Sequence, residues 1–456
     1  MNEFISRYLF YPSWELFSSR NAFSFYSSLK KLEKSQWLSK KNLEELQNKK
    51  LRHLICYAYE NVPYYRRLFD RMGIKPEQIK DKNDLQKIPV LTKDIIRKNF
   101  NKLLSKTYTP KEYWIEFTGG STGEPLRFFR DKKTHEYLLA SERRFWRWAG
   151  YDIGTKFFQL WSSPYDLKKS ESVRTKLHRF LINHRMINTF DMSKKELKNY
   201  IEEFQHIKPK IVHGYVSSVC EFARYIQQKN IQIPQPKAVI TTSEMLSDSQ
   251  RELIEKIFNC KVFQEYGCRE MGIIAHECKN HKGYHVCDEK IILEICKKGI
   301  PVEDNNPGEV TLTDLNNFAM PFIRYQNGDL AVSTENETCS CGRNLSMIKK
   351  IEGRVTDFLI GENKKMVAGV AITTYFSKIE NIKEFQFIQN QKDKVIINII
   401  KGERFSEKTI QDIHDFASRY LGRSIRVSIR YPKKIKLTKS GKKKAIICNI
   451  AKDSNH

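Results

Sequence analysis

The N-terminal part of the chain carries the apolar spacing of amphipathic helices. Between residues 35 and 72, apolar side chains recur on one stripe of a helix while lysines lie opposite. The stripe consists of Leu38, Leu43, Leu46, Leu51, Leu54 and Ile55. Residues 61–66 interrupt the pattern, and Thr92 is placed to cap a later helix through its hydroxyl. This spacing predicts a helical N-terminal region.

From residue 134 onward, β-rich runs alternate with stretches of helical spacing. A helix is expected first, over residues 134–148. Strands are then expected at 157–160, 211–213, 237–241 and 261–264, and helices at 216–229 and 247–258. Such alternation is typical of an α/β domain whose sheets are covered by helices.

The pattern changes again in the last third of the chain. Residues 283–332 are strand-rich and contain turn signals at 305–308 and 327–329, which predicts a β subdomain. After Asp357 a compact tail alternates strands and helices, at 385–389, 395–400, 406–421 and 425–431. We therefore expect a large N-terminal domain over 1–356 and a small α+β C-terminal domain over 357–456, with the boundary near Asp357.

The composition fits a globular protein with an anionic partner. The chain has 456 residues, of which 40% are hydrophobic, so it can bury a large core. Its net charge of +27 is spread along the chain and would attract nucleic acid, phosphorylated cofactors or an anionic membrane surface alike. Against nucleic acid, the sequence has no recognisable zinc-finger, RRM or helix-turn-helix spacing.

The sequence carries no pattern of export or membrane insertion. No apolar run approaches ~20 residues, and the N-terminus lacks the basic start, apolar core and small cleavage residues of a signal peptide. We expect a cytoplasmic protein. The aromatic segment at 8–14 could contact a membrane interface, although packing onto the core is the favoured role.

The clearest chemical motif is the run at 117–125, which reads Phe-Thr-Gly-Gly-Ser-Thr-Gly-Glu-Pro. Its glycines allow positive φ and leave the turn uncovered, so backbone N–H groups and hydroxyls can converge on an anion. No Gly-Lys-Ser/Thr follows, which excludes a Walker A loop. The alternative is a surface turn between strand-like runs at 115–117 and 126–129.

Other polar motifs follow this loop in a fixed order. Two of them end predicted strands of the α/β region, where such sheets place their ligands. The motifs are Thr-Thr-Ser-Glu-Met at 241–245, Gln-Glu-Tyr-Gly-Cys-Arg-Glu at 264–270, Arg-Tyr-Gln-Asn-Gly-Asp at 324–329, Gly-Arg-Val-Thr-Asp at 353–357 and Ser-Gly-Lys at 440–442. Any one of them alone would be weak evidence of function.

As an ordered set, these motifs resemble the adenylate-forming superfamily of acyl-CoA synthetases, in the branch of phenylacetate-CoA ligases and CapK-type capsule-locus proteins. Trp37-Leu38 and residues 62–66 are also typical of that branch. The resemblance implies an AMP-forming ligase that activates a carboxylic acid with ATP and Mg²⁺ and passes the acyl group to CoA or another nucleophile. It also implies a mobile C-terminal domain, and a setting in surface or capsular polysaccharide biosynthesis.

The resemblance assigns roles only to residues that match the family's motifs. Tyr266 would stack on adenine, Asp329 would accept hydrogen bonds from the ribose hydroxyls, and Glu270 would hold Mg²⁺. The β- and γ-phosphates would be held by Thr118, Gly119, Gly120, Ser121, Thr122 and Gly123. The remaining nucleotide-binding residues would be Ser243, Glu244, Glu265, Gly267 and Arg269.

The resemblance places the catalytic charge near the C-terminus. Lys442 would stabilise charge at the carboxylate and α-phosphate, and Arg354 would contact the ribose or α-phosphate. The sequence departs from the family in two places. Arg269 replaces the usual Thr or Ser beside the metal-binding Glu, and a proline is missing before the final Ser-Gly-Lys. The choice of Lys442 over neighbouring lysines therefore depends on Ser440-Gly441.

The acyl pocket is the least determined part of the site. By position it should involve residues 161–165 together with His213, Gly214 and Tyr215, where aromatic and polar groups are mixed. His213 could equally be a buried histidine whose hydrogen bonds are satisfied. An aryl acid, an amino acid and a sugar acid all remain candidate substrates.

Four of the ten cysteines and their histidine neighbours suggest a metal site. Cys278 and His285 form one close pair, and Cys339 and Cys341 form another, as a tetrahedral structural Zn²⁺ would need. His276, His281 and Cys287 are competing ligands, and a set of reduced thiols is the alternative. The family resemblance supports Cys278, His285, Cys339 and Cys341.

Two other functions stay open at this stage. An adenylyltransferase of the same fold would leave AMP on its substrate, and an inactive capsule-locus scaffold would keep the fold without activity. The expected partners are a small carboxylic acid and a nucleotide, without nucleic acid, in a monomer or a homodimer.

Overall fold

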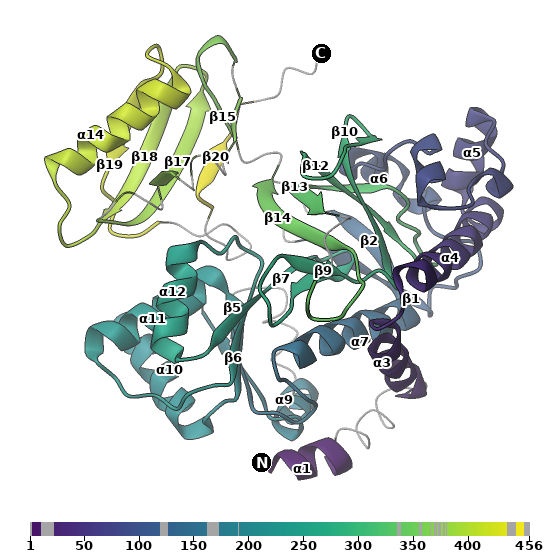
Figure 1. Ribbon diagram of the computed structural model, residues 1–456, viewed down its shortest axis with the longest axis horizontal. Coiled ribbons are helices and arrows are strands. Elements are labelled where there is room, and N and C mark those ends of the chain that lie inside the picture. The colour runs from purple at the N-terminus through teal and green to yellow at the C-terminus, as the bar shows by residue number, and fades with distance from the viewer. Residues whose placement is uncertain are drawn as a thin grey trace.

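The structure is a computed structural model of the chain. It describes residues 2–10, 22–118, 126–161, 173–189, 191–334, 339–354, 358–364, 366–368, 372, 375–376, 379, 381–435 and 444–450. Figure 1 shows a large body built around a long curved sheet, with a smaller body at one side that carries the end of the chain.

Helices make up the N-terminal region, as expected. They are α1 (Glu3–Ile5), η1 (Ser6–Phe10), α3 (Ala22–Ser35), α4 (Lys40–Asn61), α5 (Pro63–Met72), η2 (Pro76–Gln78), η3 (Lys82–Lys87), α6 (Lys93–Asn99) and η4 (Phe100–Lys102). The interruption expected over 61–66 is confined to Val62, because Pro63 occupies the first turn of α5, where no N–H is needed. The predicted cap is confirmed, since the Thr92 hydroxyl accepts from the N–H of Ile95 at 3.3 Å.

Parallel strands and their helices follow a short hairpin. The hairpin is β1 (Tyr113–Phe117) with β2 (Arg127–Asp131). The strands are β3 (Phe157–Trp161), β4 (His184–Asn188), β5 (Ile211–Tyr215), β6 (Ala238–Thr242) and β7 (Lys261–Cys268), and the helices are α7 (Lys132–Trp148), α9 (Val173–Leu181), α10 (Lys194–Ile207), α11 (Val216–Lys229) and α12 (Asp248–Phe258). The expected strands and helices are confirmed within a few residues.

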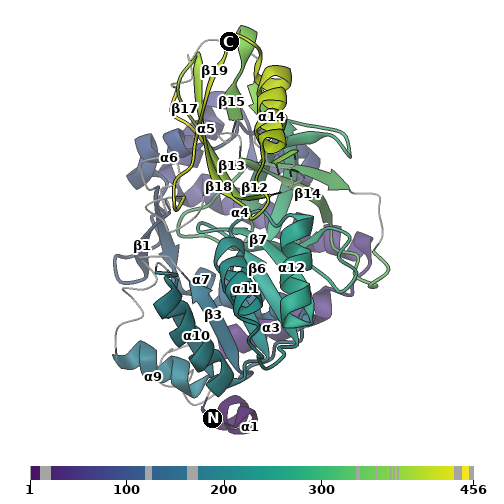
Figure 2. The ribbon, with the colours of Figure 1, turned by 90° about the vertical axis from the view of Figure 1, so that its left-hand side faces the viewer.

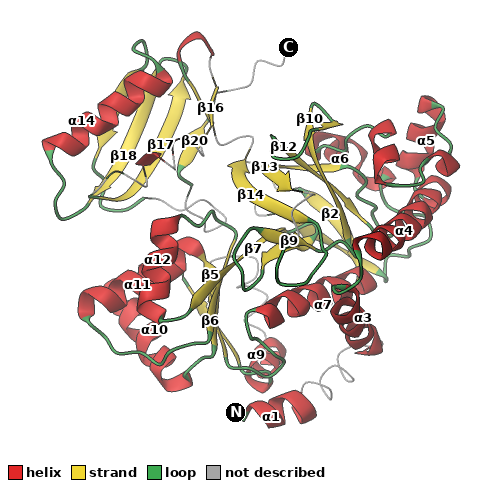
Figure 3. Cartoon of the chain, in the orientation of Figure 1, coloured by secondary structure: helices red, strands yellow, loops and turns green. Residues whose placement is uncertain are grey.

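Alternation along these strands decides which helices cover each face. Phe157, Ile211 and Ile240 point to the face packed by α3 and α7. The intervening Phe158 and Val212 point to the opposite face, which is packed by α10, α11 and α12. Figure 3 shows these three helices together on one side of β5 and β6.

The strand-rich region extends the same sheet. Its strands are β8 (Gly272–Glu277), β9 (Tyr284–Val286), β10 (Ile291–Lys297), β11 (Ile300–Pro301), β12 (Pro307–Asp314), β13 (Tyr325–Thr334) and β14 (Met347–Arg354). β7 pairs in parallel with β6 and antiparallel with β8, so it joins the two halves. The sheet has twelve strands in the order β11-β10-β12-β13-β14-β9-β8-β7-β6-β5-β3-β4.

The smaller body has its own sheet and core. Its elements are β15 (Phe358–Ile360), η5 (Glu362–Lys364), β16 (Met366–Ala368), β17 (Ile382–Gln391), β18 (Lys394–Lys401), α14 (Glu407–Phe416), η6 (Ala417–Leu421), β19 (Arg426–Arg430) and β20 (Ile446–Cys448). Phe387, Ile397 and Phe416 lie in its buried core. The mixed α/β fold class is confirmed, while the boundary near Asp357 stays a prediction because that residue lies outside the described ranges. Among the described helices, none is both long and apolar enough to cross a membrane.

One buried ion pair fixes the entry to β13. Arg324 is 1% exposed and has a left-handed φ of 52°. Its guanidinium donates to Glu294 on β10 at 3.1 and 2.9 Å. It also donates to the carbonyl oxygens of Ile88, at 2.8 Å, and Gly299, at 2.7 Å. The pair therefore connects the N-terminal region, β10 and β13.

Breaking this pair should destabilise the protein strongly. Arg324→Met leaves the Glu294 carboxylate buried without its cation, so the free energy of unfolding should fall by about 3–5 kcal/mol. The double variant Arg324→Met/Glu294→Leu removes both charges and should recover much of the loss. Urea denaturation of both variants measures this, and a double variant no more stable than the single one would contradict it.

Candidate active site

Two motifs that are distant in the sequence meet in a buried hydrogen-bonded cluster. Tyr266, on β7, donates its hydroxyl hydrogen to Oδ2 of Asp329, on β13, at 2.8 Å. Asn327 donates through Nδ2 to the same carboxylate oxygen and to the Tyr266 hydroxyl, both at 2.8 Å. Burial, and next the Asp329 carboxylate, hold the pKa of Tyr266 well above its ordinary value. The phenol therefore stays a donor that orients Asp329.

The sheet must bend for this contact to form, because β8, β9 and β14 separate β7 from β13 in strand order. The β7–β8 register shifts between Tyr266 and Gly267, and the β13–β14 register shifts between Leu330 and Ala331. Such irregularities bend a sheet and turn side chains toward one another. Packing requires glycine at position 267, because a Cβ there would lie 2.5 Å from the carbonyl oxygen of Gly272.

A second contact joins the same two motifs. Tyr325 donates its hydroxyl hydrogen to Oε1 of Glu270 at 2.5 Å, and both side chains are buried. Burial, and next the Glu270 carboxylate, raise the pKa of Tyr325 well above its ordinary value. Glu270 is therefore held by a neutral donor, which leaves its negative charge uncompensated by that partner.

The hairpin that carries the glycine-rich loop lies beside Glu270. Arg130, on β2, donates to the carbonyl oxygens of Arg269, at 2.5 Å, and Glu270, at 3.2 Å. The same nitrogen lies 3.5 Å from Glu116 on β1. The base of the loop is closed by Thr118, whose hydroxyl accepts from the N–H of Leu126 at 2.9 Å.

Ser243 and Glu244 lie just beyond the carboxyl end of β6. Ser243 has a left-handed φ of 67°, which turns the chain sharply there. The Glu244 carboxylate accepts from the backbone N–H of Ser217 at 2.7 Å and from its hydroxyl at 3.1 Å. This contact places a negative charge at the start of α11, where the helix dipole favours it.

The predicted acyl residues form part of a buried polar chain. Gln159 accepts from Nε2 of His184 at 2.9 Å and donates to Nδ1 of His213 at 3.2 Å. His213 then donates through Nε2 to Glu265 at 3.1 Å, and Trp146 donates to the other Glu265 oxygen at 2.9 Å. Both nitrogens of His213 are therefore engaged, so the alternative of a satisfied buried histidine describes its environment.

Aromatic rings surround this histidine. The ring of Trp161 is stacked on His213 with centroids 5.5 Å apart and lies 4.5 Å from the ring of Tyr215. Gly214 leaves room for β3, because a Cβ there would lie 2.7 Å from the carbonyl oxygen of Leu160. An aromatic wall therefore ends β3 and β5 at their carboxyl ends.

Several predicted site residues fall outside the described ranges. These are Gly119, Gly120, Ser121, Thr122, Gly123, Lys442 and the hinge residue Asp357. Of Arg354 only the backbone is described, and it pairs with Asp329 across β13 and β14. The structure therefore brings together Tyr266, Asp329, Glu270 and the base of the loop.

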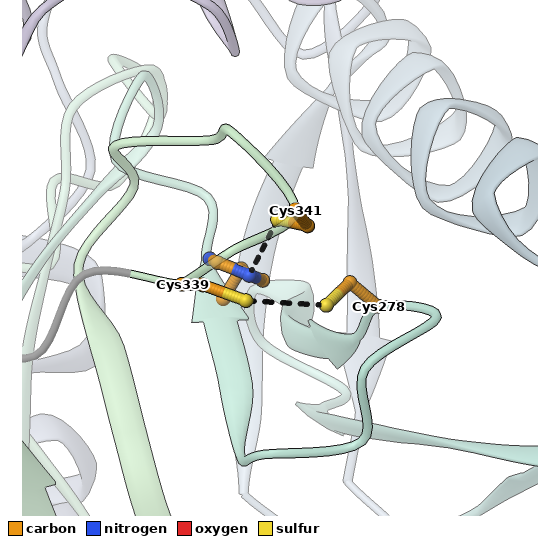
Figure 4. Close-up of side chains that lie close together, drawn as sticks. Cys278, Cys339 and Cys341 are labelled. Carbon is orange, nitrogen blue, oxygen red and sulfur yellow. Dashed lines mark hydrogen bonds between the residues drawn. The ribbon is translucent and has the colours of Figure 1, made fainter.

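The four predicted metal ligands do lie together. The ligand atoms of Cys278, His285, Cys339 and Cys341 are all within 4.8 Å of one another. Two contacts are shorter, with Sγ of Cys278 3.6 Å from Sγ of Cys339 and Sγ of Cys341 3.4 Å from Nε2 of His285. Figure 4 shows the Cys278 side chain pointing toward those of Cys339 and Cys341, which come from one other segment. A tetrahedral Zn²⁺ would set its ligand atoms about 3.8 Å apart or slightly less, so the four residues fit that ion.

The competing ligands are engaged elsewhere. His281 contacts Glu277 at 3.2 Å and His276 donates to the Glu277 carbonyl oxygen at 2.6 Å. Cys287 lies 3.3 Å from the guanidinium of Arg144. Within the cluster, burial raises the pKa of Cys278 to about 12 and lowers the pKa of His285 to about 4. Burial therefore favours the neutral thiol and imidazole in the absence of an ion.

Sequence reasoning gave no role to several residues that hold the site together. Tyr325 and Asn327 stand inside the 324–329 motif, so their closeness in sequence to Asp329 could have indicated that they support it. Arg130 and Trp146 come from segments without a motif, and their contacts depend on tertiary packing.

The chain is similar in sequence to known proteins. Residues 359–449 match the model of the CapK C-terminal domain. Protein CapK of Staphylococcus aureus is 28% identical over 432 residues, which cover 93% of this chain and 92% of CapK. A phenylacetate-coenzyme A ligase of Thermus thermophilus is 23% identical over 343 residues, which cover 71% of this chain and 73% of the ligase.

Solved ligases share the fold. A 2-hydroxyisobutyryl-CoA ligase in the postadenylation state superposes with a TM-score of 0.73 at 18% identity, over 91% of each chain. The same ligase in the thioesterification state superposes with a TM-score of 0.61 at 17% identity, over 91% of each chain.

The polar chain predicts a pH-dependent stability. Burial, and next Arg179 and Arg143, lower the pKa of His184 well below its ordinary value. As the pH falls through about 6.5, the unfolded chain binds a proton at this residue before the folded protein does, so stability falls below that pH. As the pH is lowered from about 7.5 to about 5.5, the free energy of unfolding should fall less in His184→Asn than in wild type. The difference between the two slopes should reach up to ~1.4 kcal/mol per pH unit.

Urea denaturation at several pH values measures this difference. The exposed His414 offers a control, because His414→Asn should keep the pH dependence of the wild type. Parallel curves for wild type and His184→Asn would contradict the prediction.

Proposed function

Because the chain belongs to the adenylate-forming superfamily, in its branch of phenylacetate-CoA ligases and CapK proteins, we propose that it is an AMP-forming acid–CoA ligase. In the first step it would join a carboxylic acid to the AMP part of ATP and release pyrophosphate. In the second step the acyl group would pass to the thiol of CoA or to another nucleophile. The observation that carries this proposal is the pair of buried contacts between Tyr266 and Asp329 and between Tyr325 and Glu270.

The chemistry explains why such a site needs preorganised charge. A carboxylate is a poor electrophile with a poor leaving group, and adenylation supplies AMP as the leaving group. Attack of a carboxylate on the α-phosphorus brings two anions together, so positive charge and N–H donors must already be in place. The glycine-rich loop and Lys442 would supply them.

The described residues would orient the nucleotide. Asp329, fixed by Tyr266 and Asn327, would accept hydrogen bonds from the ribose hydroxyls. Glu270 fits a hard cation, because its carboxylate supplies oxygen ligands beside the hairpin that carries the loop, and the neutral Tyr325 hydroxyl orients it. Bound there, Mg²⁺ would neutralise phosphate charge. Arg269 would make an ionic contact with the α-phosphate in place of a hydroxyl.

The separate C-terminal domain suits a two-step reaction. Lys442 is needed only while the adenylate forms, and the second nucleophile then needs room. Rotation of residues 357–456 about Asp357 would remove the lysine and open that room. The chain superposes on the postadenylation state of one ligase with a TM-score of 0.73 and on its thioesterification state with a TM-score of 0.61. These states differ in conformation but not in sequence, so the difference between the two TM-scores supports this idea.

The biological setting and the acid belong to the same proposal. The similarity to CapK supports a role in surface or capsular polysaccharide biosynthesis. The aromatic wall of Trp161 and Tyr215 supports an acid with a ring or another flat group, since stacking rewards such shapes. The presence of Glu270 and Asp329 argues against an inactive scaffold.

A structural Zn²⁺ completes the proposal. Cys278, His285, Cys339 and Cys341 would hold it as thiolates and neutral imidazole. The ion would tie the β8–β9 turn to the segment that precedes β14. A closed set of four Cys and His ligands leaves no open position for a substrate, which supports a role in stability.

Loss of either acidic residue should nearly abolish the first step. Asp329→Ala removes the ribose acceptor and Glu270→Ala removes the magnesium ligand, so acid-dependent pyrophosphate release should fall about a hundredfold or more in each. Tyr325→Phe should have a smaller effect, because it removes only a donor to Glu270.

Pyrophosphate release from ATP measures these rates. The exposed Glu303 offers a control, and Glu303→Ala should behave as wild type. Wild-type rates in both Asp329→Ala and Glu270→Ala would end the nucleotide assignment.

Metal analysis should find about one zinc per chain. Cys339→Ser/Cys341→Ser should lose the ion and lower the thermal stability, with little direct effect on chemistry in the folded fraction. Cys56→Ser, which removes a half-buried thiol on α4, is the control and should keep its zinc. The site would be excluded if the purified wild-type protein contained no zinc and were as stable as the protein supplied with zinc.

Lys442→Ala should separate the two steps. Adenylate formation should fall by about two orders of magnitude or more, because the ammonium stabilises that transition state. Transfer from a pre-made acyl-adenylate should stay near normal, and Asp357→Pro should show the reverse because a fixed φ hinders the hinge. Equal loss of both steps in Lys442→Ala would mean that the lysine is structural. Lys443→Ala is the control and should retain both adenylate formation and acyl transfer.

A further inference from the structure

The apolar stripe of α9 faces solvent. Val173, Leu177 and Phe180 follow one another at helical spacing and are 81%, 50% and 65% exposed. On the neighbouring α10 the corresponding stripe, which includes Leu197 and Phe204, is buried against the sheet. A stripe of this kind is usually covered, so its exposure on α9 needs an explanation.

The N-terminal helix adds aromatic rings to the same region. Phe4 and Tyr8 are 67% and 58% exposed, and their ring centroids lie 4.7 Å apart. Ser6, between them, donates its hydroxyl hydrogen to the carbonyl oxygen of Leu181 at the end of α9, at 2.6 Å. Figures 1 and 2 both place α1 and α9 at one end of the molecule, away from the C-terminal domain. We call Phe4, Tyr8, Val173, Leu177 and Phe180 the aromatic end.

The charges around the aromatic end are mostly positive. The sequence of α9, Val-Arg-Thr-Lys-Leu-His-Arg-Phe-Leu, contains no acidic residue, and its Lys176 is exposed. Among the described residues of this region, two acids are paired: Glu3 lies 2.9 Å from Lys210, and Asp152 lies 3.0 Å from Arg7. An exposed apolar stripe flanked by cations is the composition of a helix that lies in a membrane interface.

We propose that the aromatic end docks onto the surface of an anionic lipid bilayer. Val173, Leu177 and Phe180 enter the boundary between headgroups and acyl chains, and the basic residues of α9 stay among the anionic headgroups. A second copy of the chain fits this surface less well, because it would bring like charges together. In this orientation the bilayer lies at the end opposite the C-terminal domain, so docking leaves that domain free of the membrane.

Vesicle co-sedimentation of the full chain tests the proposal without reference to its activity. Wild type should bind vesicles of phosphatidylcholine with about a third phosphatidylglycerol, and should bind pure phosphatidylcholine much less. Leu177→Ser/Phe180→Ser should lower the partition coefficient by on the order of tenfold or more. Lys176→Glu should weaken binding at low salt, and the difference should shrink as salt is added.

Controls keep the test decisive. Met72→Ser/Ile300→Ser removes two exposed apolar side chains at other places, 47% and 67% exposed, and should bind as wild type. An unchanged melting temperature shows that the serine variants are folded. Equal binding of wild type and Leu177→Ser/Phe180→Ser, or no binding of wild type to anionic vesicles, would overturn the proposal. So would a dimer in sedimentation velocity that Leu177→Ser/Phe180→Ser abolishes while vesicle binding persists.

Discussion

The hydrogen bond from Tyr266 to Asp329 spans two strands that three others separate in the sheet, and it forms only because the sheet curls. Register shifts beside both residues supply the curl, and Gly267 allows β8 to approach β7 closely. Once β7 and β13 are joined, Tyr325 comes within reach of Glu270. The curvature of one sheet therefore brings together the predicted nucleotide-binding residues of two motifs.

The same curvature explains how the rest of the site is organised. Arg130 holds the loop that contains Glu270 against the β1–β2 hairpin, so the glycine-rich loop starts beside the acidic side chain. The hydrogen-bonded side chains from His184 through His213 to Glu265 connect the neighbouring parallel strands under the aromatic wall. Two hydrogen-bonded networks thus flank the region where we propose that ATP and the acid meet.

Periodicity predicted the elements but not their contacts. The parallel strands and the helices α7, α11 and α12 follow from alternation and helical spacing, and the Thr92 cap from residue type alone. The four candidate metal ligands could be chosen because Cys and His stood in two close pairs and the family resemblance favoured these four over their neighbours. Tyr325 and Arg130 received no role, because their partners are set by the bend of the sheet and not by local sequence. From the sequence, His213 could be a substrate ligand or a buried histidine. Its contacts with Gln159 and Glu265, which engage both ring nitrogens, could be found only from the structure.

Acid-dependent release of pyrophosphate tests the proposed ligase activity most directly. Purified full-length protein would be incubated with ATP and Mg²⁺ across a panel of aryl, amino and sugar acids, each with and without CoA. A ligase should release pyrophosphate and AMP with one class of acid and form the corresponding acyl-CoA when CoA is present. AMP retained covalently on the product, cleavage of ATP to ADP, or no acid-dependent release with any class would contradict the assignment.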